Sequence, residues 1–166
     1  MIKKSVKLLV GGFIVLTIIA ALGHRVIIPK LIPLADLPTP SGIYDVGTRI
    51  FEWTDGSRDE WFTEEKDDKR RIVVQVWYPS KDTNSDPVPY LVSADKWLPA
   101  LSGILEIPQF LFNHLRNIAT HSVLDASVNK QIEDTPLVLF SHGIWGMRFQ
   151  NTAQFEALAS RGYIVA

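Results

Sequence analysis

Residues 136 to 146 read Pro-Leu-Val-Leu-Phe-Ser-His-Gly-Ile-Trp-Gly and constrain the fold more than any other part of the chain. The apolar run from Leu137 to Phe140 stands between Pro136 and the glycine of a Ser-His-Gly triplet, a pattern that predicts a strand buried on both faces. Such strands belong to parallel sheets covered by helices, and their chemistry lies at the carboxyl ends of the strands. The His-Gly turn after this strand is therefore the first candidate for a functional site.

A helix and a second strand are expected after the turn. Residues 150 to 161 place Phe155, Leu158 and Ala159 on one face, and Gly162 is the type of residue that ends a helix. Tyr163 to Ala166 then begins another strand. A strand, a crossover helix and a strand form a right-handed unit with parallel strands, so we predict the α/β fold class.

Two more strands are expected upstream of this unit. Alternation from Thr48 to Trp53 predicts a first strand that ends in a turn at Asp55-Gly56. The run from Ile72 to Tyr78 predicts a second strand, ended by Pro79. Acidic and basic side chains nearly balance over residues 57 to 71, which is typical of a solvated loop. We expect the two strands to pair antiparallel across it.

The segment from residue 88 to residue 130 is helical and aromatic in character. Leucines recur at helical spacing within Ala94 to Leu105, and Pro108 separates this stretch from a second helical one. These helices either pack on the sheet or form an interfacial lid that admits lipid. Under the second interpretation Trp97 is a candidate substrate or lid residue.

Composition and charge exclude several classes of function. The chain has 166 residues, a formal net charge of −1 and no cysteine. It lacks the basic surface that nucleic-acid binding requires, and it cannot form a disulfide. His114 and His121 are seven residues apart in the sequence, on one face of a helix if the helix runs that far. No carboxylate or third ligand stands beside them, so we predict no metal site.

The N-terminus has the pattern of an export or membrane-insertion signal. Lys3, Lys4 and Lys7 precede an uncharged apolar run from Leu8 to Leu22. Residues 1–28 are predicted to form a signal-anchor or signal peptide with a transmembrane helix, and an uncleaved anchor is favoured. The lysines stay on the cytoplasmic side, so we expect a membrane-anchored protein with its body non-cytoplasmic, or a secreted or periplasmic one if the signal is cleaved. Prolines over residues 29–40 predict a spacer.

Four stretches of the sequence carry a family resemblance: Val-Gly-Thr-Arg-Ile-Phe-Glu-Trp at 46–53, Ile-Val-Val-Gln-Val-Trp-Tyr-Pro at 72–79, Phe-Ser-His-Gly at 140–143, and Leu-Ala-Ser-Arg-Gly-Tyr-Ile-Val-Ala at 158–166. They occur in the order seen in platelet-activating factor acetylhydrolases, and from about Pro40 onward the chain resembles the N-terminal portion of that family. The second and third are the most specific. The resemblance implies an α/β-hydrolase sheet and a serine ester hydrolase of lipid degradation that needs no cofactor. Its substrate would be the short sn-2 ester of a phospholipid or a related small ester.

The resemblance also assigns site residues. The backbone N–H of Ile144 corresponds to one oxyanion donor, with His142 and Gly143 shaping the turn, and Trp145 joins Trp97 as a substrate or lid candidate. Ser141 and His142 project to opposite faces of the strand end, so they are not a nucleophile and its base.

No Gly-x-Ser-x-Gly motif occurs in the sequence. We therefore expect residues 41–166 to be the N-terminal portion of an α/β-hydrolase domain, truncated before the nucleophile elbow, with nucleophile, acid and base all absent. A non-enzymatic class stays open, in which the chain is a membrane-tethered binding domain or pseudo-enzyme that keeps the hydrolase sheet. The expected partners are a phospholipid or small ester and, through the N-terminal helix, a membrane. The oligomeric state is not predicted.

Overall fold

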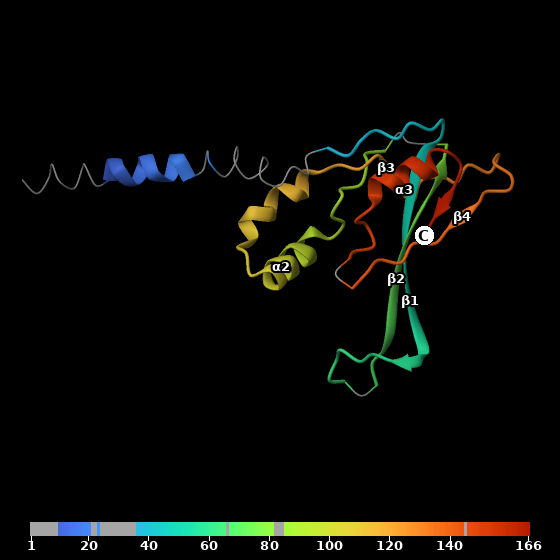
Figure 1. Cartoon of the computed structure of the whole chain (residues 1–166), viewed down its shortest axis with the longest axis horizontal. Coiled ribbons are helices and arrows are strands. Elements are labelled where there is room, and N and C mark those ends of the chain that lie inside the picture. Colours follow the sequence, from blue (N-terminus) through green and yellow to red (C-terminus); the bar gives the residue numbers. More distant parts are fainter. Residues whose placement is uncertain (1–9, 21–22, 24–35, 66, 82–84, 145) are drawn as a thin grey trace, which may run out of the picture. The chain divides into compact units, whose positions relative to one another are not determined.

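The computed structural model describes residues 10–20, 23, 36–65, 67–81, 85–144 and 146–166. Two compact units divide the chain: one comprises residues 1–35 and 93–118, the other residues 36–92 and 119–166. The first contains α2 (Ala94–Leu105) and the 3₁₀ helix η1 (Gln109–Asn117). The second contains a sheet and one helix, in chain order β1 (Asp45–Asp59), β2 (Lys69–Ser80), β3 (Ser122–Leu124), β4 (Leu137–Val138), α3 (Thr152–Ala159) and β5 (Ile164–Val165), as Figure 1 shows.

Over the described residues the sheet has five strands in the order β3-β1-β2-β5-β4. β1 pairs antiparallel with β2, and β4 pairs parallel with β5 across the crossover helix α3. Both arrangements confirm the prediction of antiparallel first strands followed by a parallel unit. β3, which pairs parallel with β1, was not predicted, because its three residues stand in a polar segment without a clear alternation.

The β1–β2 hairpin is longer than predicted. β1 does not end at Asp55-Gly56 but continues to Asp59, and β2 begins at Lys69, so the prediction that all of residues 57 to 71 form a loop is wrong. The pairing shifts register between Asp55 and Asp59. The Asp55 carboxylate accepts hydrogen bonds from the N–H and the hydroxyl of Ser57, at 3.0 and 2.6 Å, which stabilises this irregular stretch.

Pro79 does not end β2, although the sequence favoured that. It pairs with Val46, and β2 continues to Ser80. A proline removes only a hydrogen-bond donor from a strand, and the carbonyl of Pro79 still accepts the N–H of Asn129 at 3.0 Å.

The core of this unit lies between α3 and the sheet. Phe155 and Ala159 of α3 form a buried cluster with residues of three strands, namely Val46, Trp77 and Val165. The ring centroids of Trp77 and Phe155 are 4.8 Å apart. Helix 150–161 was predicted from this same face, and its central residues form α3. Gly162 follows with a positive φ of 99°, and its N–H donates to Ala159 as expected of a residue that ends a helix.

The prediction that the strand at Leu137 to Phe140 is buried on both faces is wrong for the described residues. Leu137 is 59% exposed and Leu139 is 77% exposed, whereas Val138 and Phe140 pack against the core cluster. β4 is the last strand in the order of the described sheet, and α3 covers one face of that sheet. The side chains of a strand with only one covered face point alternately into the core and into the open, which is the pattern of Leu137 to Phe140.

The other unit matches the helical prediction closely. α2 covers Ala94–Leu105, and Pro108 caps the start of η1. Arg116 of η1 donates to the Asp95 carboxylate of α2 at 2.6 Å. η1 ends at Asn117, so His114 and His121 do not share a helix face. Whether these helices act as a lid stays a prediction.

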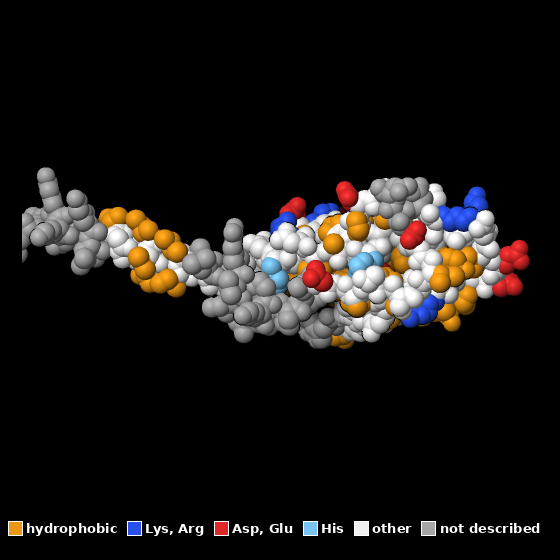
Figure 2. Space-filling view, turned by 90° about the horizontal axis from the view of Figure 1, so that it is seen from above, with side chains coloured by type: hydrophobic (Ala, Val, Ile, Leu, Met, Phe, Trp, Pro, Cys, Tyr) orange, Lys and Arg blue, Asp and Glu red, His pale blue; other side chains and the backbone are white. Residues whose placement is uncertain are grey.

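Residues 10–20 are helical, and their large hydrophobic side chains are exposed (Figure 2). The remainder of the predicted transmembrane segment 1–28, apart from residue 23, lies outside the described residues, as do residues 29–35 of the predicted spacer. In the described part of the chain, no helix combines the length and the apolar character needed to cross a membrane.

Candidate active site

The His-Gly turn lies at the carboxyl end of β4 and leads into α3. The N–H of Phe140 donates to the carbonyl of Ala166 at 2.7 Å, so pairing with the neighbouring strand extends two residues beyond β4. Ser141 therefore leaves the sheet from a fixed point. A loop between a parallel strand and the first crossover helix is where α/β-hydrolases place one of their two oxyanion donors.

Two hydrogen bonds fix the carbonyl of Gly143. It accepts the N–H of Gly146 at 2.8 Å, which closes a turn, and the Nδ1–H of His142 at 2.9 Å. The C=O and N–H of a trans peptide point to opposite sides, and the Gly143–Ile144 peptide is trans. The N–H of Ile144 therefore points away from the turn. It makes no hydrogen bond to another described residue, and Ile144 is 94% exposed.

Gly146 is the glycine that this turn requires. A Cβ at position 146 would lie 2.7 Å from the Cβ of His142 and 2.6 Å from the Oε1 of Gln150. Gln150 in turn accepts the N–H of Met147 at 3.0 Å, so it is held in place. A Cβ on Gly143 would meet nothing within 4 Å. The family resemblance singled out Gly143 and not Gly146, although both stand in the stretch from Pro136 to Gly146.

A hollow of about 360 Å³ adjoins the turn. It is lined by residues 72–75 and Trp77 of β2, by residues 139–142, and by Arg148, Phe155 and Ala166. Among the described strands β5 meets β2 only at Trp77↔Val165, so one backbone edge of residues 72–75 is open. An open strand edge accepts a further strand as readily as a ligand.

Two polar side chains of this hollow were not predicted as site residues. Gln75 is 6% exposed; its Nε2 donates to the Thr48 hydroxyl at 3.1 Å, while its Oε1 has no hydrogen-bond partner among the described residues. Arg148 lies over the ring of Phe149, 5.5 Å from its centroid. Burial lowers the pKa of Arg148, and the Glu52 carboxylate partly opposes that effect. In the sequence Gln75 is a single polar residue within the apolar run from Ile72 to Tyr78, and this alone does not mark it as a site residue.

The other predicted site residues are placed as follows. Ser141 and His142 are neighbours at the strand end, and the His142 ring bonds to the carbonyl of Gly143 instead of to the serine. Trp97 lies in α2, in the other compact unit, and Trp145 lies outside the described residues. Around this turn the described residues thus offer a donor for an oxyanion and no serine–histidine pair.

The sequence profile of the family platelet-activating factor acetylhydrolase, isoform II, matches residues 32–166. This chain belongs to that family. A ferulic acid esterase from Streptomyces cinnamoneus is similar in structure, with a TM-score of 0.62 and 28% sequence identity over 79% of this chain. The chain spans 35% of the length of that esterase chain. No curated protein matches it.

These relatives confirm the resemblance that the four sequence stretches indicated. Membership of the platelet-activating factor acetylhydrolase family and the structural similarity to the esterase together support an α/β-hydrolase type of fold for this chain. The mixed sheet with its parallel β4–α3–β5 unit agrees with that fold.

Proposed function

We propose that this chain supplies one oxyanion donor of a serine ester hydrolase that cleaves the short sn-2 ester of a phospholipid or a related small ester. The fixed Gly143–Ile144 peptide is the observation that supports this most strongly. The Gly143 carbonyl is held by two hydrogen bonds, so the N–H of Ile144 is oriented before any ligand arrives. Preorganised N–H groups of this kind stabilise charge that develops in a transition state.

The chemistry requires this donor at one step in particular. A serine oxygen adds to the ester carbonyl carbon, its proton passes to a base, and the carbonyl oxygen becomes an oxyanion. The N–H of Ile144 donates to that oxyanion until the alcohol leaves, and again when water adds to the acyl-serine. These 166 residues contain no Gly-x-Ser-x-Gly, so the proposal assigns to them the oxyanion donor alone.

The substrate class rests on the family. Its description names platelet-activating factor acetylhydrolase, which supports a 2-acetyl phospholipid, whereas the structural relative is named for ferulic acid esters. We favour the phospholipid because the family profile covers residues 32–166. No substrate group is assigned to the hollow beside the turn, because it borders the open edge of β2.

We further propose that residues 1–28 direct the protein to a membrane and leave its body on the non-cytoplasmic side. The lysines ahead of the apolar run support this orientation. Reporters active only in the periplasm or only in the cytoplasm, fused after Ala166, test it. Strong cytoplasmic activity would refute the orientation.

Hydrolysis assays test the enzymatic proposal. The protein is expressed from its complete reading frame and, separately, as residues 1–166, and both are assayed on a 2-acetyl glycerophosphocholine, a feruloyl ester and p-nitrophenyl acetate. We expect the complete protein to hydrolyse the acetyl phospholipid and to lose activity with a serine-directed phosphonate. Residues 1–166 should show no turnover above background. A complete protein without esterase activity would favour the non-catalytic binding domain instead.

A further inference from the structure

The side chain of Gln150, an exposed residue just ahead of α3, reaches back to the His-Gly turn. Its Oε1 accepts the N–H of Met147 at 3.0 Å, and its own N–H donates to the carbonyl of Met147 at 3.1 Å. In the capping box a glutamine reaches back over three residues to a backbone N–H in the same way. The two hydrogen bonds thus fix the backbone at the point where it leaves the turn.

The amide of Gln150 also lies against the backbone of Gly146. A Cβ at position 146 would stand 2.6 Å from the Oε1 of Gln150 and 3.1 Å from the carbonyl oxygen of Gly143. The N–H of Gly146 donates to that same carbonyl at 2.8 Å. Gly146 therefore connects Gln150 to the peptide between Gly143 and Ile144.

The turn is attached differently on its two sides. On the β4 side, the backbone of Phe140 is bonded into the sheet and the His142 ring donates to the Gly143 carbonyl at 2.9 Å. On the α3 side, both hydrogen bonds that Met147 makes within the described residues go to Gln150. Gln150 is therefore the support of the turn on that side.

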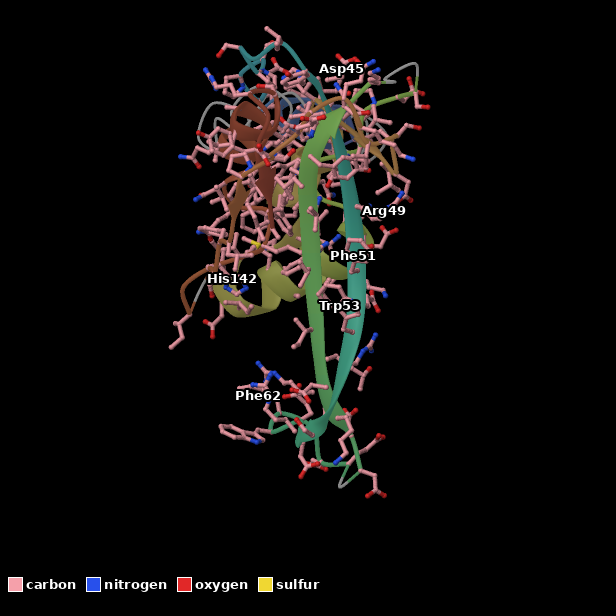
Figure 3. The ribbon with its side chains drawn as sticks, turned by 90° about the vertical axis from the view of Figure 1, so that its right-hand side faces the viewer. Asp45, Arg49, Phe51, Trp53, Phe62 and His142 are labelled. Carbon is pink, nitrogen blue, oxygen red and sulfur yellow. The ribbon has the colours of Figure 1, made fainter. Side chains whose placement is uncertain are left out.

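The turn is not held by burial. Ile144 is 94% exposed, and Gly143 and His142 are exposed as well. His142 lies to one side of the β1–β2 hairpin, between the levels of Asp45 and Phe62 at its two ends (Figure 3). In an exposed turn the hydrogen bonds, more than packing, determine how precisely a backbone N–H is oriented.

We propose that Gln150 is a positioning residue for the N–H of Ile144. The inference rests on the proposed function, in which that N–H donates to an oxyanion. Gln150 holds Met147 and Gly146, Gly146 holds the Gly143 carbonyl, and the carbonyl fixes the peptide that ends in the donor. An oxyanion donor is effective only if it is oriented before the charge develops, and a displacement of about 1 Å can slow catalysis substantially.

Three substitutions test this role in the protein expressed from its complete reading frame. Gln150→Met keeps an unbranched side chain but removes the acceptor, whereas Gln150→Glu keeps an acceptor oxygen at the same position. Gln154→Met is the matched control, because Gln154 is an exposed residue of α3 whose side chain makes no hydrogen bond to a described residue. Titration of the active serine with a phosphonate gives the concentration of competent enzyme, so kcat is compared per active site.

Gln150→Met should lower kcat for p-nitrophenyl acetate about tenfold and leave KM unchanged, since the oxyanion exists only in the transition state and the intermediate. Gln150→Glu should restore most of the lost kcat. Gln154→Met should behave as the wild type.

A double-mutant cycle separates positioning from a general structural role. Ile144→Pro removes the donor, so in that background Gln150→Met has nothing left to position and should not lower kcat further. A substitution that only loosens the fold would lower kcat by the same factor in both backgrounds.

Two kinds of failure can be told apart. If Ile144→Pro alone leaves kcat unchanged, the proposed oxyanion donor is wrong, and the positioning role is wrong with it. If Ile144→Pro lowers kcat but Gln150→Met does not, only the role of Gln150 is refuted. The same holds if the two losses multiply in full, or if Gln150→Glu is as slow as Gln150→Met.

Discussion

The two ends of the β1–β2 hairpin share one antiparallel ladder but have opposite environments. At one end Val46 and Trp77 are 2% exposed beneath α3. Towards the other end Trp53 is 53% exposed and stacks on Phe51, with ring centroids 5.5 Å apart. The backbone pairing runs through both ends with a single shift, between Asp55 and Asp59. What covers a strand, more than how it pairs, thus determines whether its side chains stabilise the fold or remain available for binding.

The largest expected effect compares one tryptophan from each end. Trp77→Ala should lower the free energy of unfolding by about 3 to 5 kcal/mol, because it removes a ring packed on Phe155 and leaves a cavity. Trp53→Ala should cost less than about 1 kcal/mol, as is usual for an exposed position. Urea unfolding followed by circular dichroism measures both. Equal losses would show that the distal end is as much a part of the core as the proximal end.

The sequence predicted the strands beneath α3 better than the distal hairpin for a physical reason. Burial imposes alternation and a helical face, so Trp77, Phe155 and the β4–α3–β5 order could be recognised. The distal hairpin is held by backbone pairing and by local ion pairs such as Lys69–Asp59. Its sequence of charged residues and a glycine is equally typical of a surface loop. For this reason residues 57 to 71 were interpreted as a loop.

The next largest loss of stability is expected from substituting a buried carboxylate. Glu156 of α3 is 0% exposed, and its Oε1 accepts the N–H of His121 at 2.7 Å and the hydroxyl of Ser122, the first residue of β3. Glu156→Ala leaves these donors without an acceptor and should cost about 2 to 3 kcal/mol. Glu156→Gln retains the acceptor oxygen and should cost less. If the alanine and glutamine variants lose the same free energy of unfolding, the Glu156 carboxylate does not stabilise β3.

The same residue predicts that the stability of the fold depends on pH. Burial raises the pKa of Glu156 above its ordinary value of 4.5. The folded state therefore holds this proton more tightly than the unfolded state, and the stabilisation is present at low pH and lost as pH rises through the folded pKa. The stability of the wild type relative to Glu156→Gln should fall over that range. A difference that does not change with pH would contradict this.

A smaller effect is expected at the turn. Gly146→Ala places a Cβ against His142 and Gln150 and should cost about 1 to 2 kcal/mol, whereas Gly143→Ala meets open space and should be nearly neutral. Unfolding measurements on the two variants compare them directly. A costly Gly143→Ala beside a neutral Gly146→Ala would mean that the turn is closed differently.

The candidate site was only partly predictable. The strand, the His-Gly turn and the donor at Ile144 follow from a local pattern and a family resemblance. Gly146 and Gln75 could not be identified, because their importance depends on contacts with Gln150 and Thr48 that only the fold creates. The hydrogen bond between Ser122 of β3 and the Glu156 carboxylate could not be predicted for the same reason.

The central claim is that the N–H of Ile144 stabilises an oxyanion, and one pair of variants tests it most directly. Proline is accepted at the second position of a turn, so Ile144→Pro removes the N–H while the Gly143–Gly146 hydrogen bond can persist. Ile144→Ala removes the exposed side chain and keeps the N–H. In the protein expressed from its complete reading frame, kcat for a short-chain ester should fall about 10²- to 10³-fold with proline and change little with alanine. Equal kcat values for the two variants would contradict the claim.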